Sequence, residues 1–280
     1  MDHSLVELLG LEDVSHAVYR KSSLVLALCQ VRFNPILSIA NPASVAPFQL
    51  AIQDLYLMTA PPPPPIAVQF APGVPVQVQQ PIAGGPWIFT DADDNWRLVL
   101  AQDAISLETR VYQSFSDFLE RLRHVLTALV QHIQPVVVTR VGLRYINEIR
   151  SDDKDRLASF ISQELLGPLS VSQFQAGAVQ SMQELLLRYE GGYGINIRHG
   201  LLPNGTTVQP RNGEEVSRVP FYLLDFDAFV ELAKPRGVPL DIDTVCEQVR
   251  DFNRTNYRLF RWSVTDQYES TLEVVRYATD

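Results

Sequence analysis

The sequence has few cysteines and no long apolar run, and each shortage excludes a class of protein. Only two cysteines occur among 280 residues, Cys29 and Cys246. This is not the cysteine-rich pattern of a secreted scaffold held by disulfides, so we expect two buried free thiols. No apolar run reaches the roughly 18 to 20 residues that a membrane helix needs. The acidic N-terminal residues lack the cationic start of a secretory signal. We therefore expect a cytoplasmic protein with no membrane partner.

Basic residues are also in short supply. The chain holds 23 Lys and Arg against 32 Asp and Glu, a formal net charge of -9. Nucleic-acid phosphates repel an acidic protein unless a local basic patch overrides the mean charge. The densest cationic stretch, Arg254, Arg258 and Arg261, is interleaved with aromatic residues and is typical of a solvated helix face. A nucleic-acid partner is therefore not expected.

The familiar metal, cofactor and nucleophile motifs are missing. His124 and His132 lie eight residues apart on one predicted helix, without a third ligand nearby. The glycines at 191–194 lack both GxGxxG spacing and the lysine of a phosphate-binding loop, which favours a turn. No GxSxG elbow occurs. We expect no cofactor and no metal, and we assign no catalytic residue, although a triad assembled from distant segments stays open.

What the sequence does contain is typical of a globular α+β protein. With 46% hydrophobic and 20% charged residues, the chain can bury a substantial core. Residues 24–33 and a three-stranded meander at 87–111 alternate as strands do. Two long helices are predicted, one capped by Ser114 or Ser116 and ending at Pro135, the other running from Asp241 to about Arg258. Shorter helices are predicted at 47–58 and 152–166, and strand-like segments at 170–189.

The order of these elements suggests two similar halves. Residues 87–149 and residues 184–265 each predict three strands followed by a long helix. We therefore predict largely antiparallel sheets with both long helices on one face, and a pseudo-duplication. The expected units are an N-terminal half, 1–150, with a proline-rich insert at 60–86, and a C-terminal half, 151–280, packed together. The run Pro61–Pro65 is either a docking ligand in polyproline II form or a stiff connector, and we favour the connector.

The candidate site lies on the strand "VTRVGLRYINEI", residues 138–149. Alternation places Arg140 and Arg144 on one face and Val141, Leu143, Tyr145 and Asn147 on the other. Two carboxylates of one strand face, Asp225 and Asp227, could bind a divalent cation or do acid–base work. The structural alternative, which we favour, is the solvated end of a strand or pairing with arginines of a neighbouring strand. Candidate ligand-binding residues share a polar side chain on these strands or on the meander; they are Arg110, Arg144, Tyr145, Asn147, Asp225 and Asp227.

Five segments, in this order, resemble a known family. They are "VLALCQVRF" (25–33), "WRLVLAQDAISLETRVYQSFSDFLERL" (96–122), "RVGLRYIN" (140–147), "YLLDFD" (222–227) and "VTD" (264–266). The family is a sporadically distributed group of uncharacterised prokaryotic proteins with a CQIRF-like first strand and an RxGLRYIN strand. No reaction is established for it. Its patchy occurrence resembles that of genes on mobile or defence-associated loci, which implies an accessory role such as antitoxin, immunity protein or adaptor.

Two functional hypotheses follow. The first is a non-enzymatic module that binds a protein partner or forms a homo-oligomer, because a core and an acidic surface are present without an assembled catalytic motif. The second is an enzyme or small-ligand-binding protein whose site lies between the sheet and the helices, around Arg144, Tyr145, Asn147, Asp225 and Asp227. A pocket beside the strand at 138–149 favours the second hypothesis.

Overall fold

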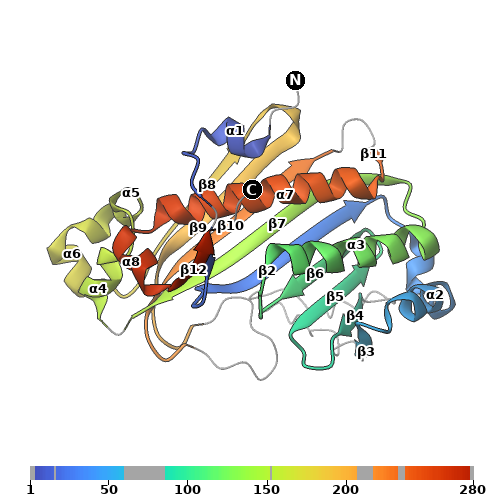
Figure 1. Ribbon diagram of the computed structural model, residues 1–280, viewed down its shortest axis with the longest axis horizontal. Helices are drawn as coiled ribbons and strands as arrows, with labels where there is room; N and C mark the ends of the chain where they lie inside the picture. The colour runs from blue at the N-terminus through green and yellow to red at the C-terminus, as the bar shows by residue number, and fades with distance from the viewer. Residues whose placement is uncertain are drawn as a thin grey trace, which may run out of the picture.

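One antiparallel sheet of ten strands runs through the protein, as Figure 1 shows. The computed structural model describes residues 4–15, 17–59, 86–151, 153–206, 217–232 and 237–277. The strand order is β3-β4-β5-β6-β2-β7-β10-β9-β8, with β11 paired to the start of β7. The strands of this sheet are β2 (Leu24–Phe33), β3 (Leu57–Thr59), β4 (Trp87–Thr90), β5 (Trp96–Ala101), β6 (Ala104–Thr109), β7 (Val137–Arg150), β8 (Ser181–Arg188), β9 (Tyr193–Leu202), β10 (Phe221–Glu231) and β11 (Val238–Pro239). A separate two-stranded sheet pairs β1 (Ala17–Tyr19) with β12 (Val274–Tyr277).

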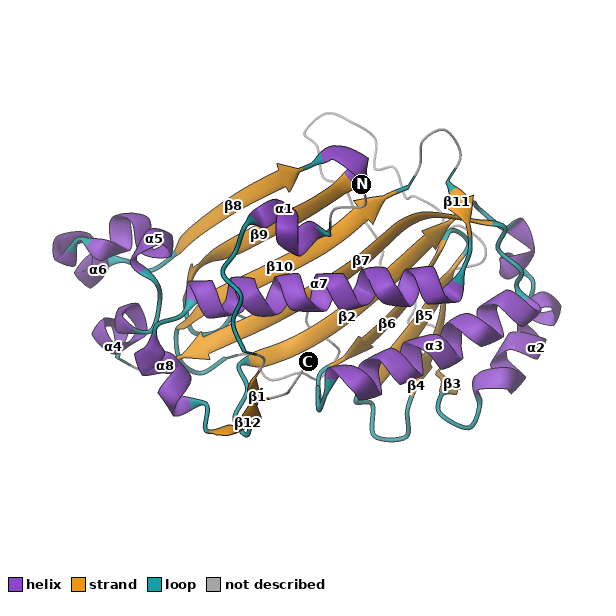
Figure 2. Cartoon of the chain, turned by 45° about the horizontal axis from the view of Figure 1, so that its top comes forward, coloured by secondary structure: helices purple, strands orange, loops and turns teal. Residues whose placement is uncertain are grey.

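The two long helices, α3 and α7, lie on the same face of the ten-stranded sheet (Figure 2). The Ser114 hydroxyl caps α3 by accepting from the Asp117 N–H at 3.2 Å, and the Asp241 carboxylate caps α7 through the Thr244 N–H at 2.7 Å. The helices, including short 3-10 turns, are α1 (Leu5–Leu9), η1 (Leu37–Ala40), α2 (Pro42–Ile52), α3 (Phe115–His132), α4 (Lys154–Ser159), α5 (Gln163–Leu166), η2 (Gly167–Ser170), α6 (Ser172–Gly177), η3 (Glu190–Gly192), α7 (Ile242–Ser263) and α8 (Asp266–Thr271). The predicted α+β class, with both long helices on one sheet face, is confirmed.

The middle of the sheet joins segments that are distant in the sequence. β7 pairs with β2 on one side and with β10 on the other, the latter over eleven residue pairs. The sheet is thus continuous across residue 150, where the two predicted halves meet. The N-terminal residues also reach the C-terminal half, because the Leu5 N–H donates to the Asp251 carboxylate of α7 at 2.7 Å. The division into 1–150 and 151–280 and the duplication stay predictions.

Three local predictions were wrong in their boundaries. The helix expected at 47–58 is α2, which starts at Pro42, because the Asn41 side chain accepts from the Ala43 N–H at 3.0 Å and caps that earlier position. The helix expected at 152–166 is broken into α4 and α5, because Ile161 forms an isolated β-bridge with Val264 between them. In the segment 170–189 only β8 is a strand, and η2 and α6 precede it.

Other sequence expectations concern the cysteines, the proline-rich insert and membrane spans. Cys29 and Cys246 are buried free thiols, as predicted. Nearly all of the predicted insert at 60–86, including Pro61–Pro65, lies outside the described residues. No helix among the residues that the structure describes combines the length and apolar character needed to cross a membrane.

Candidate functional site

The predicted site residues are divided between the two faces of the sheet. β7 places Arg144 on the face without the long helices and Tyr145 on the face beneath α7, because successive side chains of a strand point to opposite sides. Asp225 and Asp227 of β10 share the face of Arg144, whereas Asn147 shares the face of Tyr145. The prediction of one cavity surrounded by all five residues was therefore wrong.

On the face without the long helices, the charged residues bind one another. Arg144 forms two bonds with Asp225, Nε to Oδ1 and Nη2 to Oδ2, each 2.7 Å long. Arg198 of β9 donates to Asp225 from its other side, with Nε 3.0 Å from Oδ2. Arg140 donates to Asp227 at 2.9 Å. The alternative in which the arginines bridge these carboxylates across strands is confirmed.

Burial limits what these carboxylates can do chemically. Asp225 is only 1% exposed, and both of its oxygens already accept from arginines. Burial raises the pKa of Asp227, and the opposing effect of Arg140 and Arg144 is smaller. Paired, desolvated carboxylates of this kind hold strands together and offer little to a ligand from solution. The charged residues of this face therefore form an ion-pair ladder.

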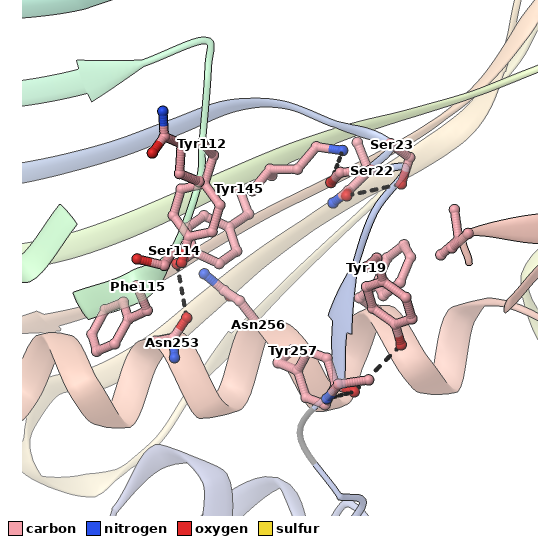
Figure 3. A pocket seen from close by; sticks show the side chains of 16 residues that line it. Tyr19, Ser22, Ser23, Tyr112, Ser114, Phe115, Tyr145, Asn253, Asn256 and Tyr257 are labelled. Atoms are coloured by element: carbon pink, nitrogen blue, oxygen red, sulfur yellow. Dashed lines mark hydrogen bonds between the residues drawn. The ribbon is translucent and has the colours of Figure 1, made fainter. Parts of the chain in front are cut away.

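The opposite face holds a pocket between the sheet and the helices (Figure 3). Its volume is about 150 Å³. The lining residues come from β1, the turn before β2 and its first residue, the segment between β6 and α3 with the first residue of α3, β7, α7 and Leu272. They are Ala17, Tyr19, Ser22, Ser23, Leu24, Tyr112, Gln113, Ser114, Phe115, Tyr145, Asn147, Asn253, Asn256, Tyr257, Phe260 and Leu272. We call this set the tyrosine pocket. Of the predicted candidates, it contains Tyr145 and Asn147.

A chain of neutral hydrogen bonds fixes one wall of the tyrosine pocket. The Tyr145 hydroxyl donates to Asn253 Oδ1 at 2.8 Å and lies 3.1 Å from the Tyr112 hydroxyl. Figure 3 shows Tyr112 and Tyr145 facing Asn253 of α7. On β2's side, the Ser23 hydroxyl donates to Asn147 Oδ1 at 3.2 Å. These bonds orient the side chains before any ligand arrives.

Asn256 leaves one acceptor without a partner. Its Nδ2 donates to the Leu143 carbonyl at 3.0 Å, whereas its Oδ1 is buried and accepts no hydrogen bond from a described residue. A buried acceptor in this state costs about 1 to 3 kcal/mol.

The tyrosine pocket is electrically neutral. None of its described lining residues is Asp, Glu, His, Lys, Arg or Cys. Burial raises the pKa of Tyr19, Tyr112 and Tyr145 above that of an exposed tyrosine, so these hydroxyls stay protonated at neutral pH. The pocket therefore offers hydrogen bonds and aromatic surface rather than charge.

A second hollow, of about 370 Å³, adjoins the first. Ser22, Ser23 and Leu272 line both. Its other lining residues are mostly charged or polar; they are Lys21, Glu148, Arg150, Ser151, Arg156, Phe160, Tyr268 and Thr271. We call it the basic hollow, because three cations and one carboxylate are among its described lining residues.

The asparagines of α7 are the main residues that the sequence argument missed. The buried stripe of α7 runs through Val249, Phe252 and Leu259. Asn256 stands on this stripe, four residues after Phe252. Asn253 stands four residues after Val249. Polar residues on the buried stripe of an amphipathic helix need partners, and this signal was available in the sequence.

The remaining candidate, Arg110, follows the last residue of β6 and does not line the tyrosine pocket. Within the described residues, no group of three or more His, Cys, Asp or Glu side chains is arranged to hold a metal ion. Comparison with known proteins gives no matching family model and no matching curated protein. The resemblance based on the five segments stays a prediction.

Proposed function

We propose that the protein binds the uncharged ring of a small molecule in the tyrosine pocket. The observation that carries the proposal is a preformed cavity between sheet and helices whose described lining is neutral, aromatic and rich in hydrogen-bonding groups. Ligand sites commonly combine apolar walls with a few placed polar groups. A cavity of about 150 Å³ accommodates a molecule the size of benzene, so one ring is the expected occupant.

The neutral lining favours binding over acid–base catalysis. Proton transfer near neutral pH needs a group whose pKa lies near that pH, such as histidine or a perturbed carboxylate. The tyrosines and asparagines described here do not meet this need, because burial moves the tyrosine pKa values upward. The protein is therefore proposed as a sensor or carrier of its ligand.

Calorimetric titration with phenol, uracil and uridine tests the binding. Gln113 lies at the exposed rim, so Gln113→Trp narrows the tyrosine pocket without altering the core. We expect at least one compound to bind the native protein and to lose at least tenfold in affinity in Gln113→Trp. Arg32→Ala, an exposed residue outside the pocket, serves as the control. Absence of binding by all three compounds, or equal binding to both proteins, contradicts the proposal.

A second candidate function, protein binding, is favoured by the edge strand β8. Among the described strands, β8 pairs only with β9 and ends the sheet. Leu185 and Leu186, on opposite faces of β8, are 51% and 52% exposed. Open edges with apolar side chains recruit further strands.

The occupant that we propose for β8 is a second copy of the chain. A two-fold axis perpendicular to the sheet at Leu186 sets this leucine opposite the same leucine of the partner, which gives a self-complementary antiparallel pair. Sedimentation equilibrium tests this: the native protein is expected to be dimeric and Leu186→Lys monomeric. Leu57→Lys is the matched control, because Leu57 is an exposed leucine of β3, at the other end of the strand order. A monomeric native protein contradicts the proposal.

A further inference from the structure

The basic hollow suggests that the ligand also carries a negatively charged group. Lys21, Arg150 and Arg156 line it, and Glu148 is the one carboxylate among the lining residues that the structure describes. That carboxylate is nearly buried and already accepts from Arg150, with Nε 3.0 Å from Oε2. The hollow therefore presents an excess of positive charge in a protein whose net charge is -9.

Two of the cations, Lys21 and Arg156, are available to a ligand because their present contacts are exposed ones. Lys21 pairs with Glu273 at 2.5 Å, but both side chains are well exposed. Such a pair contributes at most about 1 kcal/mol. The Arg156 guanidinium lies 5.4 Å from the Phe160 ring centre, a contact that leaves its donors in solvent. An anion with several oxygens can therefore recruit these groups without breaking a buried pair.

Ser22 and Ser23 connect this charge to the tyrosine pocket, since both residues line both hollows. One molecule with a neutral ring and an anionic end matches the two environments. Three cations suit a doubly charged group better than a single carboxylate, because each added charge gains from each cation. Resting on the proposed function, we infer that the ligand is a ring-bearing phosphate monoester, such as a nucleoside monophosphate, with its phosphate in the basic hollow.

Calorimetry with matched probes tests the inference on the full chain. The probes are uridine, uridine 5′-monophosphate and inorganic phosphate. We expect the monophosphate to bind roughly ten- to a hundredfold more tightly than uridine, as charged hydrogen bonds predict. Arg156→Ala is expected to remove about tenfold of the monophosphate affinity and to leave uridine unchanged. Gln113→Trp is expected to weaken both, and Arg32→Ala neither.

The outcomes separate the inference from the function on which it rests. Equal affinities for uridine and its monophosphate overturn the phosphate inference and leave ring binding in the tyrosine pocket intact. If inorganic phosphate binds as tightly as the monophosphate, and Gln113→Trp leaves the monophosphate affinity unchanged, ring binding in this pocket is overturned. Binding by none of the three probes overturns the inference for this class of ligand.

Discussion

The two faces of β7 carry polar residues of different kinds, although Arg144 and Tyr145 are neighbours in the chain. On the face without the long helices, Arg144 and Arg198 donate to both oxygens of Asp225, so that the negative charge of this carboxylate is paired with positive charges. On the helix face, Tyr145 and Asn253 bond to each other beside a cavity, and Asn256 keeps an acceptor without a described partner. Polar residues that are mutually satisfied hold the sheet together, whereas those that line an open volume offer contacts to a ligand.

The largest expected loss of stability distinguishes the buried ion pairs of the ladder from an exposed ion pair. Asp225→Ala leaves two arginines beside a site that is nearly inaccessible to water, and we expect a loss of about 3 to 5 kcal/mol in the free energy of unfolding. Urea denaturation measures it. The matched control is Asp103→Ala, whose pair with Arg32 is 40% and 48% exposed and which is expected to cost less than about 1 kcal/mol. Similar losses in the two variants would mean that the ladder does not stabilise the sheet.

An intermediate effect is expected on the helix face. Tyr145→Phe keeps the buried ring but removes the hydroxyl that bonds to Asn253, and we expect a cost of about 1 to 2 kcal/mol. A double-mutant cycle with Asn253→Leu isolates this bond, because the second change removes the acceptor that Tyr145→Phe leaves unsatisfied. Costs that simply add would show that the two side chains do not interact, and the proposed wall of the tyrosine pocket would lose its fixed geometry.

Most of the fold could be predicted from the sequence, because the periodic signals are strong where the core is. The strand at 24–33, the meander and the stripe of α3 all lie where apolar spacing places them. The same alternation correctly assigned Arg144 and Tyr145 to opposite faces. It did not place α2 or divide the helix at 152–166, where an N-cap and a single β-bridge decide the boundaries.

The tyrosine pocket is harder to predict, because it is assembled from five separate parts of the chain. Its walls depend on the rotation of α7, which sets Asn253 and Asn256 over β7, and on the return of β1 beside β12. Neither the rotation of α7 nor the pairing of β1 with β12 is encoded in a local sequence pattern. The alternation of β7 nevertheless identified Tyr145 and Asn147 as inward-facing, and the stripe of α7 contains the asparagines that complete the site.

The smallest expected effect is a pH dependence of stability caused by His199, which lies on the sheet face that α3 and α7 cover. His199 Nδ1 lies 2.8 Å from the Tyr222 hydroxyl, which itself donates to the Leu165 carbonyl at 2.8 Å, and burial lowers the pKa of this histidine. The unfolded chain therefore binds the proton more readily than the folded chain. Stability should be fully present above the ordinary histidine pKa of about 6.5 and should decline as the pH falls below it. Urea denaturation at pH 7 and pH 5 measures the difference, which His199→Gln is expected to reduce. An unchanged difference in that variant would show that a group other than His199 causes the loss at pH 5. Asp227 is not such a group, because its raised pKa favours the folded state on protonation.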